Sequence, residues 1–219
     1  MKRISILFLY VVLCILLSSC IEEDDENEPV VDDSGMCTKF NFNIRPLTNP
    51  VSQCGLPGDL TMDVMNKMNE FWGSDAEACS VPGLSNGLVL HADPARIYYD
   101  PDMLGFWDEY YNSTLPADIF LAHEYGHVVQ NGLNLENPYK ELQADCLAGY
   151  YMGYENCQGN VSESDVMATY SHFCDIGNVA MNTPWWDTSA HGTCTQRVAN
   201  LQQGFNGYKD GLLPGEACP

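Results

Sequence analysis

The sequence predicts an α+β fold in which a small antiparallel strand layer packs on core helices. Two short apolar runs, Leu88 to His91 and Arg96 to Tyr99, flank a turn signal near Asp93-Pro94, which is typical of a strand pair. Segments before and after this pair instead repeat apolar residues at helical spacing. The 219 residues suit one domain with extensions and are enough to bury a proper core.

Residues 1–19 have the pattern of an export signal. Lys2 and Arg3 precede an apolar run from Ile4 to Leu17, which is too short for a comfortable membrane span. The run ends in Leu-Ser-Ser-Cys, which resembles the lipobox of bacterial lipoproteins and makes Cys20 the expected lipidation site. An ordinary signal peptide with an incidental cysteine is the alternative. We therefore expect an exported lipoprotein at the bacterial outer membrane or cell surface.

Residues 20–35 form an acidic, proline-containing run without apolar periodicity, which predicts a disordered tether. Its composition also resembles the surface-export signal of lipoproteins in bacteria of the Bacteroidetes type. Two of the nine basic residues lie in the signal, so the exported chain would carry seven bases against 30 acids. Such a charge excludes attraction to nucleic acid or to anionic lipid headgroups.

Eight cysteines remain when Cys14 in the signal and Cys20 at the anchor are set aside. An even number in an exported chain predicts up to four disulfides, although 105 pairings are possible. The eight contain no Cys-x-x-Cys pair, which argues against a zinc ribbon or a thioredoxin-type motif. The remaining residues, 36–219, are expected to form the folded domain.

Residues 36–60 predict an irregular lead-in, pinned by Cys37 and Cys54, because prolines and other breakers are frequent there. A helix is expected from Thr61 to Trp72, where methionine and aromatic residues recur at helical spacing. We interpret this stripe as core packing rather than as a substrate surface.

Another helix is predicted between Pro116, in its first turn, and Asn131-Gly132, which closes it. It carries His123 and His127, which lie on one face at positions i and i+4 and can aim two imidazoles at one metal ion. Glu124 lies about 100° around the helix, so its carboxylate is expected to reach a water molecule rather than the metal.

The third ligand that a hydrolytic zinc site needs is predicted to be Glu141. Asn137-Pro138 reads as the start of its helix, and Asp145 lies one turn after Glu141 on the same face. In this interpretation, Asp145 accepts the free ring N–H of a ligand histidine. The alternative is that both carboxylates belong to a solvated acidic face.

Ser162 to Cys174 predicts another helix, and Thr193 with Gln196 forms a capping box for a last helix that ends at about Gln203, with Gly204 as its stop. His191 lies just before that helix. It is either an oxyanion-stabilising residue near the metal or a structural histidine, and the sequence leaves both open.

Two other residues are weaker candidates. Arg197 is expected to bridge to a carboxylate near the site, although the sequence names no partner. His91 lies beside a turn without a partner at ligand spacing, so we interpret it as a surface or turn histidine.

Three stretches carry a family resemblance: HEYGHVVQN, ELQADCLAGYY and HGTCTQRVANLQQGF. They resemble the three motifs of the neutral zinc metallopeptidase family of bacteria, of the glutamate-zincin type, and the likeness runs from about Cys79 to Phe205. The resemblance implies a zincin-like fold, Zn²⁺ at His123, His127 and Glu141, and Glu124 as catalytic base of an endopeptidase acting on proteins or peptides.

The chain departs from the family in three places. Val128 and His91 stand where the family often has histidine and cysteine, and the usual N-terminal membrane helix is replaced. Two other functions therefore stay open. One is a non-catalytic, surface-anchored binding lipoprotein on a zincin scaffold. The other is a self-inhibited protease whose residues 36–60 cover the cleft.

Overall fold

A computed structural model of the protein describes residue 37 and residues 58–84, 88–90, 95–133, 139–180 and 192–219. Predictions for the export signal, Cys20, the acidic tether, His91 and His191 lie outside these residues and stay predictions. The same holds for most of the lead-in 36–60. Within the described part, no helix has the length and apolar character that a membrane span requires.

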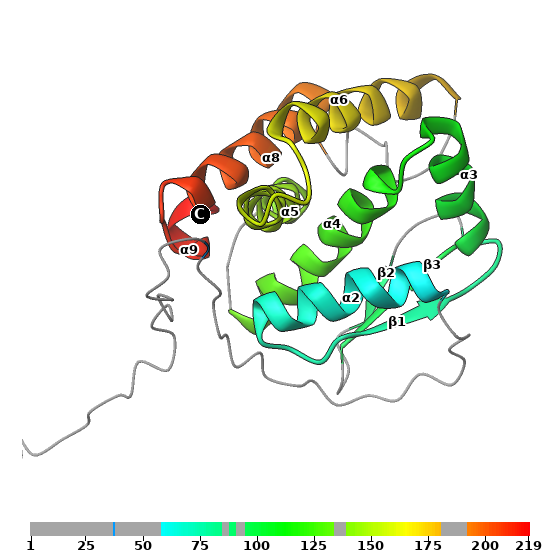
Figure 1. Cartoon of the computed structure of the whole chain (residues 1–219), viewed down its shortest axis with the longest axis horizontal. Helices are drawn as coiled ribbons and strands as arrows, with labels where there is room; N and C mark the ends of the chain where they lie inside the picture. The colour runs from blue at the N-terminus through cyan, green and yellow to red at the C-terminus, as the bar shows by residue number, and fades with distance from the viewer. Residues whose placement is uncertain (1–36, 38–57, 85–87, 91–94, 134–138, 181–191) are drawn as a thin grey trace, which may run out of the picture.

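The described elements give an α+β arrangement in layers (Figure 1). Helices α4 and α5 lie in the middle, with α2 and the sheet on one side and α6 and α8 on the other. The helices are α2 (Asp59–Trp72), α3 (Pro101–Tyr111), α4 (Leu115–Gly132), α5 (Lys140–Cys157), α6 (Glu163–Ala180), α8 (Cys194–Lys209) and α9 (Pro214–Ala217).

The sheet is mixed, so the prediction of a purely antiparallel layer is wrong. Strands β2 (Leu88–Leu90) and β3 (Arg96–Tyr99) pair antiparallel, as the predicted strand pair requires. A third strand, β1 (Glu77–Ser80), pairs with β3 in parallel, which gives the order β1-β3-β2. The sequence did not reveal β1 because its partner is not its neighbour along the chain, so no hairpin signal connects them.

Helix α2 confirms the core-packing interpretation of the methionine and aromatic stripe. Met65, Met68, Phe71 and Trp72 are all at most 2% exposed. Met62, one turn earlier, is 44% exposed and marks the edge of the buried face. The helix ends at Gly73, whose φ of 62° is the left-handed conformation that glycine adopts without strain.

The central helices approach each other closely because small residues line their contacts. A side chain at Gly126 of α4 would press on the backbone of Ala144 in α5, which is fully buried. A Cβ at Gly204 of α8 would overlap the carbonyl oxygen of Cys146. The prediction that Gly204 stops the last helix is therefore wrong: α8 continues to Lys209, and the glycine lets α8 lie against α5. The Thr193–Gln196 capping box at its start is confirmed.

Disulfides tie distant parts of the chain to α5. Cys37 is bonded to Cys157 at the end of α5. Cys54, the other cysteine predicted to pin the lead-in, lies outside the described residues. Cys146, in the middle of α5, is bonded to Cys218. All six cysteines whose side chains the structure describes are disulfide-bonded, so none of them offers a thiolate to a metal.

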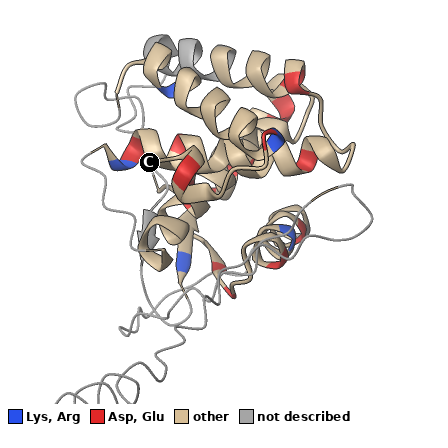
Figure 2. Ribbon diagram, turned by 90° about the vertical axis from the view of Figure 1, so that its left-hand side faces the viewer, with Lys and Arg blue, Asp and Glu red and all other residues tan. Residues whose placement is uncertain are grey.

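Among the described residues, Asp and Glu lie on several helices rather than on one element (Figure 2). Asp118, in the first turn of α4, is partly buried and accepts a hydrogen bond from Thr114. Burial, with the nearby carboxylates of Asp108 and Glu155, raises the pKa of Asp118 to about 7, although Thr114 and Lys67 act in the opposite direction. Folding therefore keeps a proton on Asp118 that the unfolded chain releases near pH 4.

Stability is expected to fall as the pH rises from about 4 to about 7, because the unfolded state binds fewer protons at this group across that window. In Asp118→Asn, the fall in unfolding free energy between pH 5 and pH 8 should be smaller than in the wild type by about 1–3 kcal/mol, a range discounted for partial exposure. Chemical denaturation at both pH values measures it. The exposed Asp75→Asn is the control, and equal pH dependence in all three proteins would contradict the prediction.

Candidate metal centre

The predicted ligands come together at the junction of α4 and α5. His123 and His127 lie one turn apart on α4, and Glu141 lies in the first turn of α5. Glu141 Oε2 is 3.3 Å from His123 Nε2 and 3.5 Å from His127 Nε2. The ligand atoms of the three residues all lie within 4.8 Å of one another. The helix α5 begins at Lys140, with Tyr139 as N-cap, rather than at Pro138, but this does not move Glu141 or Asp145 off the shared face.

The three side chains of this cluster differ in their exposure to solvent. The His123 side chain is fully buried, whereas those of His127 and Glu141 are 19% and 26% exposed. Solvent therefore reaches the cluster at His127 and Glu141, and His123 lies on its buried side.

Behind His123 lies a buried charged group. Asp145 Oδ1 is 2.8 Å from His123 Nδ1, and Arg197 donates from Nε to Oδ2 and from Nη2 to Oδ1, both at 2.8 Å. The Tyr170 hydroxyl donates a further hydrogen bond to Oδ1. Burial opposes ionisation of Asp145, but Arg197 and His123 together lower its pKa to about 2. An ionised Asp145 requires the proton on His123 Nδ1, which leaves the Nε2 lone pair for a metal.

The charges of the cluster favour a cation among the ligands. Burial opposes the charged form of His123, but Asp145 and Glu141 raise the pKa of this histidine to about 9. Burial also opposes ionisation of Glu141, yet the contacts with His123 and His127 hold the pKa of its carboxyl well below the usual range. A divalent ion would replace the protons that balance these carboxylates.

Glu124 is buried beside the ligands, at 3% exposure. Burial raises the pKa of its carboxyl, while the charges of His123 and His127 act against this rise. Glu141 adds to the rise through repulsion between the two carboxylates. Glu124 is thus a carboxyl whose proton affinity is increased next to the candidate metal position.

Sequence reasoning named most of the residues in this centre and missed three. Arg197 was expected to pair with an unspecified carboxylate, and the structure shows that this carboxylate is Asp145. The three missed residues are Tyr170, Gln130 and Gln143. Tyr170 on α6 has no motif, and no signal in the sequence points to it. Gln130 and Gln143 were also missed; Gln130 follows His127 by three positions, which is contact spacing on a helix and was a usable signal.

Comparison of the chain with known protein families, with curated proteins and with solved structures gives no match. The family resemblance of the three motifs therefore stays an expectation, and the interpretation of the site rests on its geometry.

Proposed function

We propose that the protein is a zinc-dependent metallopeptidase with a zincin-like fold, acting on proteins or peptides. The observation that carries this proposal is the convergence of His123 Nε2, His127 Nε2 and Glu141 Oε2 on one point, with Glu124 buried next to them. Two imidazoles and one carboxylate are a ligand set that hydrolytic zinc sites use, with a fourth position left for water or substrate.

Two of the three separations between the ligand atoms match those expected around zinc. Nitrogen and oxygen ligands of a tetrahedral zinc ion lie at about 2.0–2.2 Å from it, and so roughly 3.3–3.6 Å from one another. The two distances from Glu141 Oε2, 3.3 and 3.5 Å, fall in this range. Asp145 behind His123 supplies the outer hydrogen bond that ligand histidines ordinarily make.

In the proposed hydrolysis, the three ligands and Glu124 would have different roles. Zinc held by His123, His127 and Glu141 would supply Lewis-acid chemistry that acidifies water and polarises the scissile carbonyl. Glu124 would take a proton from the attacking water and pass it to the leaving amine, and its raised pKa suits it to hold that proton in between. The exposed sides of His127 and Glu141 would admit the peptide.

We further propose that the enzyme is exported and anchored at Cys20. Support within the described residues comes from the cysteines, because disulfides of this number persist in oxidising compartments outside the cytosol.

Metal analysis tests the proposed centre directly. Protein purified without added zinc should contain about one zinc per chain, lose it to a strong chelator and regain it from solution. Folded protein that holds no zinc and takes up none would contradict the metal centre and favour the binding-protein alternative.

A further inference from the structure

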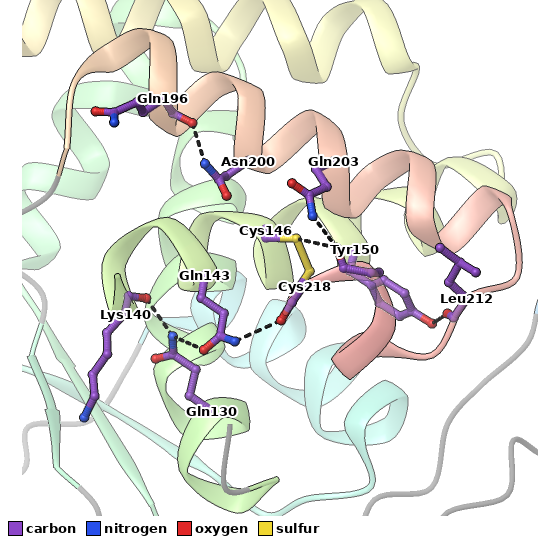
Figure 3. Close-up of a disulfide and its surroundings, with 11 residues drawn as sticks. Gln130, Lys140, Gln143, Cys146, Tyr150, Gln196, Asn200, Gln203, Leu212 and Cys218 are labelled. Carbon is purple, nitrogen blue, oxygen red and sulfur yellow. Dashed lines mark hydrogen bonds between the residues drawn. A yellow bond between two sulfur atoms is a disulfide. The ribbon is translucent and has the colours of Figure 1, made fainter. Parts of the chain in front are cut away.

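A line of hydrogen bonds joins His127 to Cys218, the second-last residue of the chain. Figure 3 shows the part of this line that runs from Gln130 through Gln143 to Cys218. His127 Nδ1 is 2.8 Å from Gln130 Oε1, and Gln130 Nε2 is 3.0 Å from Gln143 Oε1. Gln143 Nε2 is in turn 2.9 Å from the carbonyl oxygen of Cys218. Gln130, Gln143 and Cys218 are 6%, 3% and 1% exposed, so the line is shielded from solvent.

Two backbone carbonyls, those of Cys218 and Lys140, fix the direction of the hydrogen bonds along this line. The backbone carbonyl of Cys218 can only accept, so Gln143 must present its NH₂ group there and its amide oxygen to Gln130. Gln130 must then donate to that oxygen, as it also donates to the carbonyl of Lys140 at 2.6 Å. The oxygen of Gln130 is left to face His127, whose Nδ1 must therefore carry the proton.

The accepting carbonyl is itself held in place. The Cys146–Cys218 disulfide ties the C-terminal turn, which comprises α9 and Cys218, to α5. Next to it, Gln203 Nε2 donates to the carbonyl of Ala217 at 2.7 Å. A disulfide and a side-chain hydrogen bond thus hold the end of the line in place.

We propose that Gln143 and Gln130 are positioning residues through which the disulfide-anchored C-terminal turn sets the tautomer and ring orientation of His127. The inference rests on the proposed metal centre. For His123, the charged Asp145 fixes the tautomer and the ring orientation. His127 has only neutral amides on its Nδ1 side among the described hydrogen bonds. An amide can face either way, so fixed acceptors have to set its direction. The Lys140 carbonyl does this for Gln130 directly, and the Cys218 carbonyl adds to it through Gln143.

Zinc affinity of the full chain tests the proposal by competition with a chelator of known affinity. Gln143→Met keeps the length of the side chain and removes both of its hydrogen bonds, and it should raise the zinc Kd about 10-fold, in the range found for outer hydrogen-bond partners. Gln203→Met is the matched control, because it also removes a glutamine bond to the C-terminal turn but lies outside the line. Its zinc Kd should stay within about 2-fold of wild type. Equal loss in both variants, or no loss in Gln143→Met, would overturn the proposal.

A spectroscopic measurement on the wild type covers the case in which a variant fails to fold. In zinc-loaded, ¹⁵N-labelled protein, long-range ¹H–¹⁵N spectra should show the His127 proton on Nδ1 and the metal on Nε2. Zinc on Nδ1 would overturn the positioning role while leaving the metal centre standing. Absence of zinc binding by the wild type would instead overturn the proposed function, and the positioning role with it.

Discussion

Glu124→Gln is expected to retain zinc and to lose at least ~100-fold in the rate of peptide hydrolysis, as is typical when a general base is removed. Glutamine has nearly the same shape as glutamate but cannot take a proton from water. Since Glu124 is buried and is not one of the three converging ligands, the metal content should stay near one per chain. Initial rates on a peptide library, with zinc measured in the same samples, give both quantities.

Glu155→Gln is a suitable control for this experiment. Glu155 is also a buried glutamate, but it lies near the end of α5 and bonds to Asn160. Its replacement should leave the hydrolytic rate unchanged. Undiminished turnover in Glu124→Gln would remove Glu124 from the mechanism. A wild type that binds one zinc and hydrolyses no peptide would favour the binding lipoprotein.

Glu141→Ala should weaken zinc binding more than any other single change outside the histidines, by well over 100-fold, because it removes a direct ligand. Asp145→Asn should weaken it less, by roughly 10–100-fold, since Asp145 acts through His123. Titration with zinc in the presence of a competing chelator measures the whole series.

Loss of one negative charge from an acidic protein is a separate effect and needs its own control. Glu77→Ala removes a partly exposed carboxylate of β1 that pairs with Arg96, away from the candidate centre. Its zinc affinity should match that of the wild type. Normal affinity in Glu141→Ala would show that another residue completes the site.

Local rules explain which parts of the fold the sequence predicted. The helices α2 and α4 follow from apolar spacing and end signals within one segment, and the capping box of α8 follows from two residues three positions apart. The end of α8 was predicted too early because the sequence of α8 alone does not distinguish two roles of a glycine. A glycine can end a helix, or it can lie within a helix where a neighbouring helix packs closely. Strand β1 was missed for a similar reason, since its pairing is not local.

In the candidate site, too, features of a single helix were predicted, whereas features that depend on how helices pack were not. The spacing of His123 and His127 is a property of one helix, and Asp145 follows Glu141 on another, so sequence rules reach them. That Glu141 Oε2 lies within 3.5 Å of both histidines depends on how α4 packs on α5, which no local pattern encodes. Tyr170 and Gln143 take part only because α6 and the C-terminal turn pack there.

Arg197 and Cys218 lie near the end of the chain and are therefore synthesised after the candidate ligands. His123, His127 and Glu141 leave the ribosome well before the two residues whose contacts reach back to those histidines through Asp145 and through the two glutamines. A nascent or truncated chain carries every ligand yet lacks the contacts that orient them. In the proposed metallopeptidase, these orienting contacts would therefore form only after the C-terminus has docked and Cys146 has been joined to Cys218.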